Sequence, residues 1–254
     1  MKNLLVIQHD HTSPLGPIAE RFVERGYDLT MHQVVPEAAY LSPGVTTEFP
    51  DFTRFDAVVP MGAPWSTYDH DLIGSWVLPE TEELQRADEA GVPMMGICFG
   101  GQLLASALGG AVRGNTSPEI GWCEVHSDDE SLVPNGPWFQ WHYDGWELPP
   151  GAREVARNDA ASQAFVLRRN LAVQFHPELT SAGLAGWLGA GGEEEARAAG
   201  FDPEQLVSST LAREGEARQR AHLLVDGFLD GVATRSTDPA RSGAHSGAHS
   251  GAAE

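Results

Sequence analysis

The segment Gly96-Ile97-Cys98-Phe99-Gly100-Gly101-Gln102 places a thiol among small residues, at a point where a strand pattern ends and a helix pattern begins. A nucleophile on such a sharp elbow has a strained backbone, so small residues are required two positions before and two positions after it. Gly96 and Gly100 occupy those positions, and free amides at the start of the following helix favour the thiolate of Cys98. The segment therefore predicts a cysteine nucleophile. A buried cysteine between packing glycines is the alternative for this motif taken alone.

A base and a carboxylate follow later in the chain, in His176-Pro177-Glu178. Because proline disfavours helical backbone in the residue before it and fixes its own φ, His176 should be extended and Glu178 should project to a similar side. His176 would take the thiol proton of Cys98 and later donate to a leaving amine, while Glu178 fixes the tautomer and stabilises the imidazolium. A His-Pro-Glu tripeptide alone is typical of a loop, but this one follows a second apolar strand.

Acyl transfer on a sheet of this kind also needs amides that hold an oxyanion, one directly after the nucleophile and one from a separate strand-to-helix loop. Phe99 supplies the first amide. The second is predicted in Met61-Gly62-Ala63-Pro64-Trp65-Ser66, where Gly62 stands at the point at which backbone must approach a ligand. Taken alone, this segment is a turn.

The elements that must position these residues alternate between short apolar runs and helical patterns, which is typical of a parallel sheet covered by helices. Strands are predicted at 4–8, 27–34, 55–61 and 93–97. The intervening helices are predicted to begin near Pro17, near Leu78 and just after Cys98. The strand at 93–97 leads directly into the nucleophile.

From residue 111 onward the pattern changes to shorter, often alternating strands, which predicts an antiparallel extension of the same sheet. These strands are predicted at 123–126, 138–142, 153–157 and 164–167, followed by a strand at 171–175 and helices at 185–188 and 203–232. The predicted fold class is α/β, with a flavodoxin-like mixed sheet that is mostly parallel, flanking helices, an antiparallel extension and C-terminal helices.

Residues 1–235 are predicted to form one domain. Residues 236–254 repeat Ser-Gly-Ala-His among small residues and cannot bury enough apolar area to fold, so they are predicted to be a disordered low-complexity tail. The tail histidines His245 and His249 have no cysteine or acidic ligand between them, and His9-Asp10-His11 has no fourth ligand spaced for it. We therefore expect no bound metal and no cofactor.

The charge balance argues against two classes of partner. The chain has 16 basic and 36 acidic residues and a net charge of -20, which repels nucleic acid and anionic membrane surfaces. No apolar stretch reaches the roughly 18 residues of a membrane span. Only two cysteines occur, Cys98 and Cys123, so we expect no disulfide framework. We expect a cytoplasmic location, where thiols stay reduced. Cys123 lacks the neighbours of Cys98 and is predicted to be an inert core residue.

The Gly-Ala-Pro loop, Gly-Ile-Cys-Phe-Gly-Gly-Gln and Gln-Phe-His-Pro-Glu, in this order and spacing, resemble the class I glutamine amidotransferases. The resemblance runs from about residue 4 to residue 232. It is closest to a stand-alone branch similar to the glutaminase domain of GMP synthetase, judging by Glu119-Ile120-Gly121-Trp122 and Trp141-His142-Tyr143-Asp144.

The resemblance implies a function and a set of site residues. It implies that Cys98, His176 and Glu178 form a triad that cleaves the γ-amide of glutamine through a cysteine thioester, giving glutamate and ammonia. It implies that Gly62 and Phe99 serve the oxyanion, and that the substrate-binding residues are Gln102, His142, Tyr143 and Asp144. Two departures stand out: Ala63 replaces a glycine of the usual loop, and Tyr143 replaces the glycine of the usual His-Gly-Asp.

Several functions remain open on the sequence alone. Glutamine hydrolysis would feed a separate synthetase subunit, because the chain has no glycine loop of the P-loop or Rossmann pattern. The same triad could instead hydrolyse another γ-glutamyl amide or peptide, which the departure at Tyr143 favours. A catalytically silent binding protein on this scaffold would be free to lose a triad residue, and a cysteine peptidase or stress protein fits Gln102 and His-Pro-Glu less well.

Overall fold

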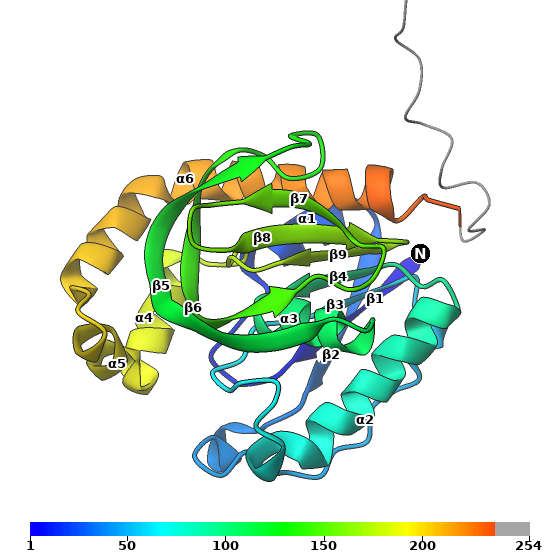
Figure 1. The fold of residues 1–254 in the computed structure, drawn as a ribbon, viewed down its shortest axis with the longest axis horizontal. Helices are drawn as coiled ribbons and strands as arrows, with labels where there is room; N and C mark the ends of the chain where they lie inside the picture. Colours follow the sequence, from blue (N-terminus) through cyan, green and yellow to red (C-terminus); the bar gives the residue numbers. More distant parts are fainter. Residues whose placement is uncertain (237–254) are drawn as a thin grey trace, which may run out of the picture.

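The computed structural model describes residues 1–236, which form one sheet of nine strands with helices on both sides (Figure 1). In spatial order the strands are β2 (Tyr27–Gln33), β1 (Lys2–Gln8), β3 (Ala57–Pro60), β4 (Met94–Ile97), β9 (Asn170–Val173), β8 (Ser162–Leu167), β7 (Arg153–Arg157), β5 (Ala111–Ser127) and β6 (Gly136–Glu147). Pairings from β2 to β9 are parallel and those from β9 to β6 are antiparallel. The mixed sheet with its antiparallel extension is therefore confirmed. The predicted tail, apart from Ser236, lies outside the described residues.

The helices are distributed over both faces of the sheet. They are α1 (Gly16–Glu24), α2 (His70–Glu89), α3 (Phe99–Ala107), α4 (Ser181–Trp187), α5 (Glu193–Ala198) and α6 (Pro203–Gly227), with short helical turns η1 (Glu37–Ala39), η2 (Phe52–Arg54), η3 (Leu188–Gly192) and η4 (Phe228–Val232). In Figure 1, α6 runs along the top of the molecule, α2 lies at the lower right, and α4 and α5 lie at the left. No helix within residues 1–236 is long and apolar enough to cross a membrane.

Strand β1 shows why the sheet is covered on both faces. Its residues Leu4 and Val6 belong to one buried cluster, which includes residues of α1 and α6, while Leu5 and Ile7 belong to a second, which includes residues of α2 and α3. Successive side chains of a strand point to opposite faces, so a strand with no polar alternation has to be buried on both. Because β1, β3, β4 and β9 are parallel, their carboxyl ends lie at the same edge of this doubly covered sheet.

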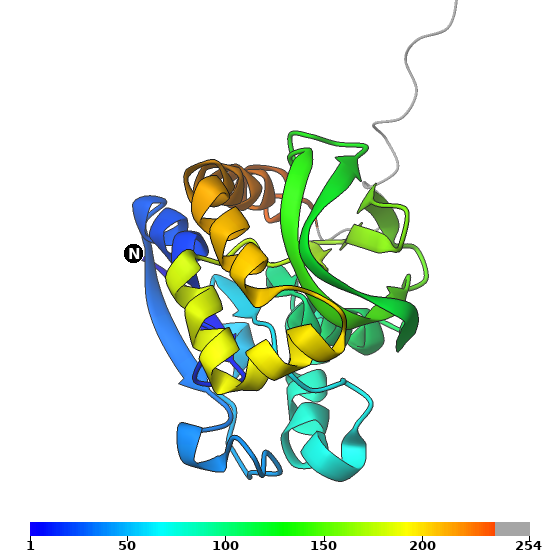
Figure 2. The ribbon, with the colours of Figure 1, turned by 90° about the vertical axis from the view of Figure 1, so that its left-hand side faces the viewer.

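A third buried cluster joins the C-terminal helices to the β5–β6 hairpin. Ile120 and Phe139 of the hairpin pack with Leu184 of α4 and Leu206 of α6. In Figure 2, α4, α5 and the start of α6 lie beside the hairpin, at the same side of the molecule. This packing holds α4, α5 and the start of α6 against the hairpin.

Several elements differ from the sequence prediction in their length, and α2 and β5 are the clearest cases. Helix α2 begins at His70 rather than near Leu78, because Ile73, Trp76 and Val77 are buried against the sheet and hold the turns that precede Pro79. Strand β5 begins at Ala111 instead of 123, and an irregularity between Gly114 and Glu119 interrupts its pairing with β6. A bulged strand loses its regular alternation, which is the signal that would have identified it.

Candidate active site

Cys98 lies at a strained elbow between β4 and α3. Its backbone has φ 48° and ψ −108°, and Arg168 is the one other non-glycine residue with positive φ among residues 1–236. Such a conformation costs free energy and persists only where the surrounding packing imposes it. The elbow predicted from the sequence therefore has the backbone geometry of a nucleophile turn.

The glycines around Cys98 leave no room for a side chain. A Cβ atom on Gly100 would lie 2.1 Å from the carbonyl oxygen of Pro60, and one on Gly96 would lie 2.6 Å from the carbonyl oxygen of Gly100. The start of α3 thus packs backbone to backbone against the end of β3 and of β4. This contact explains why both positions must be glycine.

His176 and Glu178 reach Cys98 through the pairing of β4 with β9. Ile97 is paired with Val173, and the amide of Cys98 donates to the carbonyl oxygen of Val173 at 2.8 Å. The segment that follows β9 therefore lies beside the elbow. His176 Nδ1 donates to Glu178 Oε1 at 2.7 Å, and both side chains are buried.

Charge around His176 favours its protonated form. Burial lowers the pKa of His176, but the carboxylate of Glu178 and the sulfur of Cys98 outweigh this effect and raise it well above its usual value. Its second ring nitrogen, Nε2, is buried and has no hydrogen-bond partner within the described part of the chain. An imidazole held in this way by a carboxylate can exchange a proton with the neighbouring thiol.

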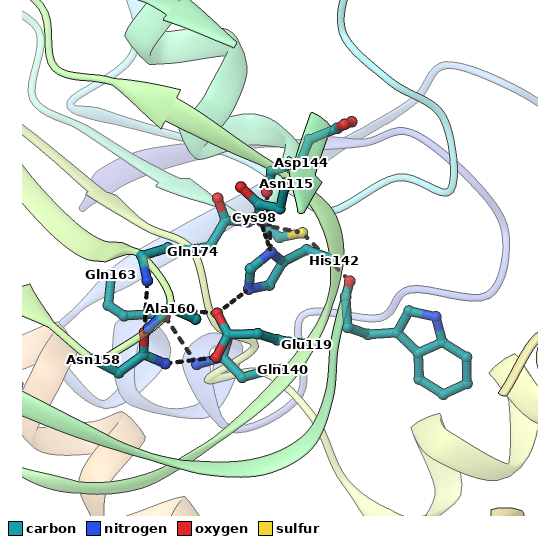
Figure 3. Close-up of polar contacts among 12 residues, drawn as sticks. Cys98, Asn115, Glu119, Gln140, His142, Asp144, Asn158, Ala160, Gln163 and Gln174 are labelled. Carbon is teal, nitrogen blue, oxygen red and sulfur yellow. Dashed lines mark hydrogen bonds and ion pairs between the residues drawn. The ribbon is translucent and has the colours of Figure 1, made fainter. Parts of the chain in front are cut away.

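Two groups that were not expected from the sequence contact the sulfur of Cys98. Its Sγ lies 3.9 Å from the carbonyl oxygen of Trp141, and the side-chain amide of Gln174 donates to Sγ at 3.7 Å (Figure 3). Gln174 precedes His176 by two residues in the strand pattern, so its side chain is expected on the same side.

Gly62 lies directly beside the predicted triad. A Cβ atom at this position would be 3.2 Å from Cε1 of His176 and 3.9 Å from Cβ of Cys98. The amide of Phe99, at the first position of α3, has no acceptor within its own helix. Both predicted oxyanion residues therefore border the space above Cys98.

One cleft brings the predicted substrate residues together with Cys98 and His176. Its wall includes Gln102, His142, Tyr143 and Asp144. The carboxylate of Asp144 accepts hydrogen bonds from Ser66 Oγ at 2.6 Å and from Tyr68 Oη at 2.8 Å. Asp144 thus ties the β6 strand to the segment that follows Gly62.

Gln102 and His142 belong to a buried polar network beneath this cleft. Figure 3 shows His142 in this network, together with Glu119 and Gln163. The side-chain amide of Gln102 donates to the backbone oxygen of Asp144 at 3.2 Å and to Gln174 Oε1 at 3.3 Å. His142 lies between that same backbone oxygen, 3.0 Å from its Nδ1, and Glu119, 3.2 Å from its Nε2. Both ring nitrogens of His142 therefore face protein groups, so it supports the cleft wall.

Glu119 anchors the far side of the network. Asn158 Nδ2 donates to its Oε1 at 2.6 Å and Gln163 Nε2 to its Oε2 at 3.0 Å. Burial raises the pKa of Glu119, but hydrogen bonds from His142, Asn158 and Gln163 more than offset this and lower it below its ordinary value. A charged carboxylate thus holds β5, β6 and β8 together.

The outer wall of the cleft comes from helices whose role the sequence did not reveal. Trp187 of α4 packs edge-on against the ring of His176, with centroids 4.8 Å apart, and Glu195 of α5 accepts from Trp141 Nε1 at 3.2 Å. Burial and the nearby Glu195 raise the pKa of Tyr143 to about 12. No short motif marks these residues, because they approach Cys98 only through tertiary packing.

The histidines near the N-terminus do not form a metal centre. His9 pairs with Glu80, Asp10 accepts from the backbone and hydroxyl of Thr12 and from Ser13, and His11 packs against Tyr40. Within residues 1–236 no group of three His, Cys, Asp or Glu side chains is placed to hold a metal ion.

Comparison with protein families decides the relationship. The model of the family "Glutamine amidotransferase class-I" matches residues 13–184, which include Gly62, Cys98, His176 and Glu178. The chain belongs to the class I glutamine amidotransferases. It is accordingly an enzyme of the glutamine amidotransferase type, and the fold described above is the fold of this family.

The relatives of this amidotransferase include GMP synthases. It is 32% identical to the glutamine-hydrolysing GMP synthase of Aeropyrum pernix over 200 residues, a match that covers 68% of the chain and 37% of that protein. It is 30% identical over 171 residues to one subunit of the glutamine-hydrolysing GMP synthase of Saccharolobus solfataricus, which is 58% of the chain and 83% of that subunit. The chain thus spans about a third of the Aeropyrum enzyme and most of the Saccharolobus subunit.

Solved structures agree on the fold. A glutamine amidotransferase from Thermotoga maritima superimposes with a TM-score of 0.77 at 24% identity, covering 90% of this chain and 98% of that one. One from Methylobacillus flagellatus gives a TM-score of 0.79 at 23% identity, covering 94% and 98%. The flavodoxin-like architecture predicted from the sequence of this amidotransferase is confirmed.

Proposed function

We propose that this amidotransferase hydrolyses the γ-amide of glutamine through a thioester on Cys98. The Cys98 thiolate attacks the γ-carbonyl carbon, and the amides of Gly62 and Phe99 hold the resulting oxyanion. His176 gives its proton to the amide nitrogen, the C–N bond breaks, and ammonia leaves. Water, deprotonated by His176, then attacks the γ-glutamyl thioester, which releases glutamate and regenerates the thiol.

One observation carries this proposal. Cys98 stands on a strained elbow with φ 48°, beside a buried His176 whose Nδ1 donates to Glu178 at 2.7 Å. A base oriented by a carboxylate next to a strand-to-helix nucleophile is the arrangement that acyl transfer requires. Membership of the class I family supports glutamine as the acyl donor.

The ammonia is proposed to pass to a separate synthetase chain. This chain covers 83% of a relative that is one of the subunits of a GMP synthase. When one subunit releases ammonia and another uses it, glutamine hydrolysed without a bound acceptor is wasted. We therefore expect slow glutamine turnover by the isolated chain, and faster turnover when the synthetase partner reorganises the loop around Gly62.

A second candidate substrate is a γ-glutamyl amide larger than glutamine. Tyr143 is 41% exposed and lines the cleft together with Tyr40, Trp187 and Glu195. These side chains extend the wall beyond the space above Cys98. They offer aromatic surface and negative charge to the amine portion of a conjugate.

Steady-state hydrolysis of glutamine and of a panel of γ-glutamyl amides by the isolated chain separates these candidates. We expect glutamine to have the highest kcat/KM, and its turnover to rise on addition of the synthetase subunit of a GMP synthase. Tyr143→Gly is the matched variant, and should change kcat/KM for the larger amides more than for glutamine. Efficient turnover of one conjugate with little turnover of glutamine would favour the second candidate.

A further inference from the structure

His9 and Glu80 form a fully buried pair directly behind Gly62. His9 follows β1 and Glu80 lies on α2, and each side chain is 0% exposed. His9 Nε2 lies 3.1 Å from Oε1 and 3.0 Å from Oε2 of Glu80, while its Nδ1 lies 3.3 Å from the carbonyl oxygen of Gly62. Neither side chain lines the cleft, so the reaction steps above do not use them.

The partners of His9 determine its protonation. A carbonyl oxygen can only accept, so Nδ1 must carry a hydrogen, and a carboxylate likewise requires a hydrogen on Nε2. His9 is then an imidazolium paired with a carboxylate. Burial lowers the pKa of His9, but Glu80, the Gly62 carbonyl and Asp10 together raise it above its usual value, in agreement with the geometry.

The hydrogen bond to Gly62 fixes the direction of a peptide plane. In a trans peptide the carbonyl and the following amide point to opposite sides, so holding the Gly62 oxygen also sets the Ala63 amide and restricts rotation of the loop. Gly62 lines the cleft with Cys98 and His176, and a Cβ atom added to it would lie 3.2 Å from Cε1 of His176. A rotation of this peptide would therefore move a backbone group next to the reacting atoms.

His9 also contacts the second oxyanion residue. Its ring packs edge-on against Phe99, with centroids 4.8 Å apart, and on another side lies 5.6 Å from the ring of Trp76. Burying an ion pair contributes little net stability, since the cost of removing both charges from water offsets their attraction. A buried pair that touches both oxyanion residues is better explained by the positioning of that site.

We propose that His9, paired with Glu80, is a positioning residue that holds the Gly62–Ala63 peptide, and with it the loop that carries the Gly62 amide, in the orientation required for the oxyanion. This role rests on the proposed hydrolysis through Cys98. Oxyanion donors act only when they are placed beforehand, and losing one costs about 100- to 1000-fold in kcat. Releasing the loop without deleting the amide should cost less, about 10- to 100-fold.

The test compares variants that remove the anchor with variants that keep it. His9→Phe combined with Glu80→Leu removes both charges and the hydrogen bond while filling the space with apolar groups. Glu80→Gln is the conservative change, because its amide can donate to Nε2 and leave the Nδ1 hydrogen on Gly62. Glu82→Gln, exposed on the same helix, is the matched surface control.

Three measurements are made on each variant: kcat and KM for glutamine, the rate of Cys98 alkylation by iodoacetamide, and the melting temperature. Iodoacetamide reacts by displacement without forming an oxyanion, so its rate reports on the thiolate alone. The double variant should lose about 10- to 100-fold in kcat, with KM, alkylation and melting temperature little changed. Glu80→Gln should retain kcat within about threefold, and Glu82→Gln should match the wild type.

The results distinguish a failure of the positioning role of His9 from a failure of the proposed hydrolysis through Cys98. A folded double variant with wild-type kcat overturns the positioning role, whereas equal glutamate release by the wild type and by Cys98→Ala overturns the proposed function instead. If the double variant does not fold, nuclear magnetic resonance of the wild type still decides. A slowly exchanging Nδ1–H signal from His9 is expected, and its absence overturns the proposal.

Discussion

Cys98 and Cys123 have the same thiol side chain but lie among different neighbouring groups. Cys98 has His176 and a donating Gln174 beside its sulfur. Burial and the nearby carboxylate of Glu119 raise the pKa of Cys123 to about 11. Its thiolate fraction at neutral pH is therefore about 100-fold below that of an ordinary cysteine.

This difference predicts selective labelling. A glutamine-like chloroketone should alkylate Cys98 at least about 100-fold faster than Cys123 at neutral pH, and glutamine should protect Cys98. Peptide mapping by mass spectrometry after timed reaction measures both rates. Faster labelling of Cys123, or labelling of Cys98 that glutamine does not slow, would show that the cleft is not the glutamine site.

At the residue scale, the candidate site residues that could be predicted from the sequence are those that lie in short local motifs. Cys98 lies between Gly96 and Gly100, and His176 and Glu178 are joined by one proline. His9 and Glu80 are 71 residues apart, and neither has a local signature. Their pairing depends on how α2 packs on the sheet, so no local pattern in the sequence could identify it.

At the scale of elements, the junction of β3, β4 and α3 is the part of the fold that carries the nucleophile. Its tightest contact is between Gly100 and Pro60. The periodic strands and the start of α3 were predicted from sequence to within a few residues. The β5 strand and the first turns of α2 were not, because a bulge and tertiary burial, rather than periodicity, determine them.

Two alanine substitutions test this junction. Gly100→Ala would place a Cβ atom 2.1 Å from the Pro60 oxygen, so it should destabilise the protein by more than about 4 kcal/mol or prevent folding. Gly215→Ala, at an open position within α6 where a Cβ atom meets nothing within 4 Å, is the matched control. It should stabilise by about 0.5–1 kcal/mol.

Chemical denaturation of the two variants and the wild type gives the comparison. Gly100→Ala should lower the free energy of unfolding, whereas Gly215→Ala should raise it. If Gly100→Ala were as stable and as active as the wild type, the backbone contact at the elbow would be wrong.

At the scale of the whole molecule, three buried histidine–glutamate pairs of the described residues surround the cleft: His9 with Glu80, His142 with Glu119 and His176 with Glu178. They connect α2, β5, β6 and the segment after β9 at one edge of the sheet. Because each pair is buried only in the folded chain, the charge state of this edge is linked to folding.

The sign of that linkage follows from His9 and His176. Each has a folded pKa raised above 6.5, so each stabilises the fold fully below pH 6.5 and loses that contribution as pH rises through the folded pKa. The unfolding free energy, from urea denaturation at several pH values, should therefore decline on the alkaline side. The slope is at most about 1.4 kcal/mol per pH unit for each proton.

The His9→Phe, Glu80→Leu double variant isolates the first pair in this experiment. Asp10 and His32 are the other titratable groups that act on His9 or feel its charge, and both remain in the variant. The stability difference between wild type and variant should shift against the wild type above pH 6.5. A difference that is constant with pH would mean that folding does not change the pKa of His9, and a difference that shifts in favour of the wild type as pH rises would mean that His9 is neutral in the folded protein.

The proposed chemistry requires Cys98 to carry a γ-glutamyl thioester during turnover. The direct measurement is acid quenching of the isolated protein with glutamine, followed by mass spectrometry of the Cys98 and Cys123 peptides and assay of glutamate. We predict a γ-glutamyl group on the Cys98 peptide of the wild type. We also predict no such group in Cys98→Ala, together with at least about a 1000-fold loss of glutamate release. Glutamate release by Cys98→Ala at the wild-type rate, or a γ-glutamyl group on Cys123 instead, would contradict the thioester mechanism.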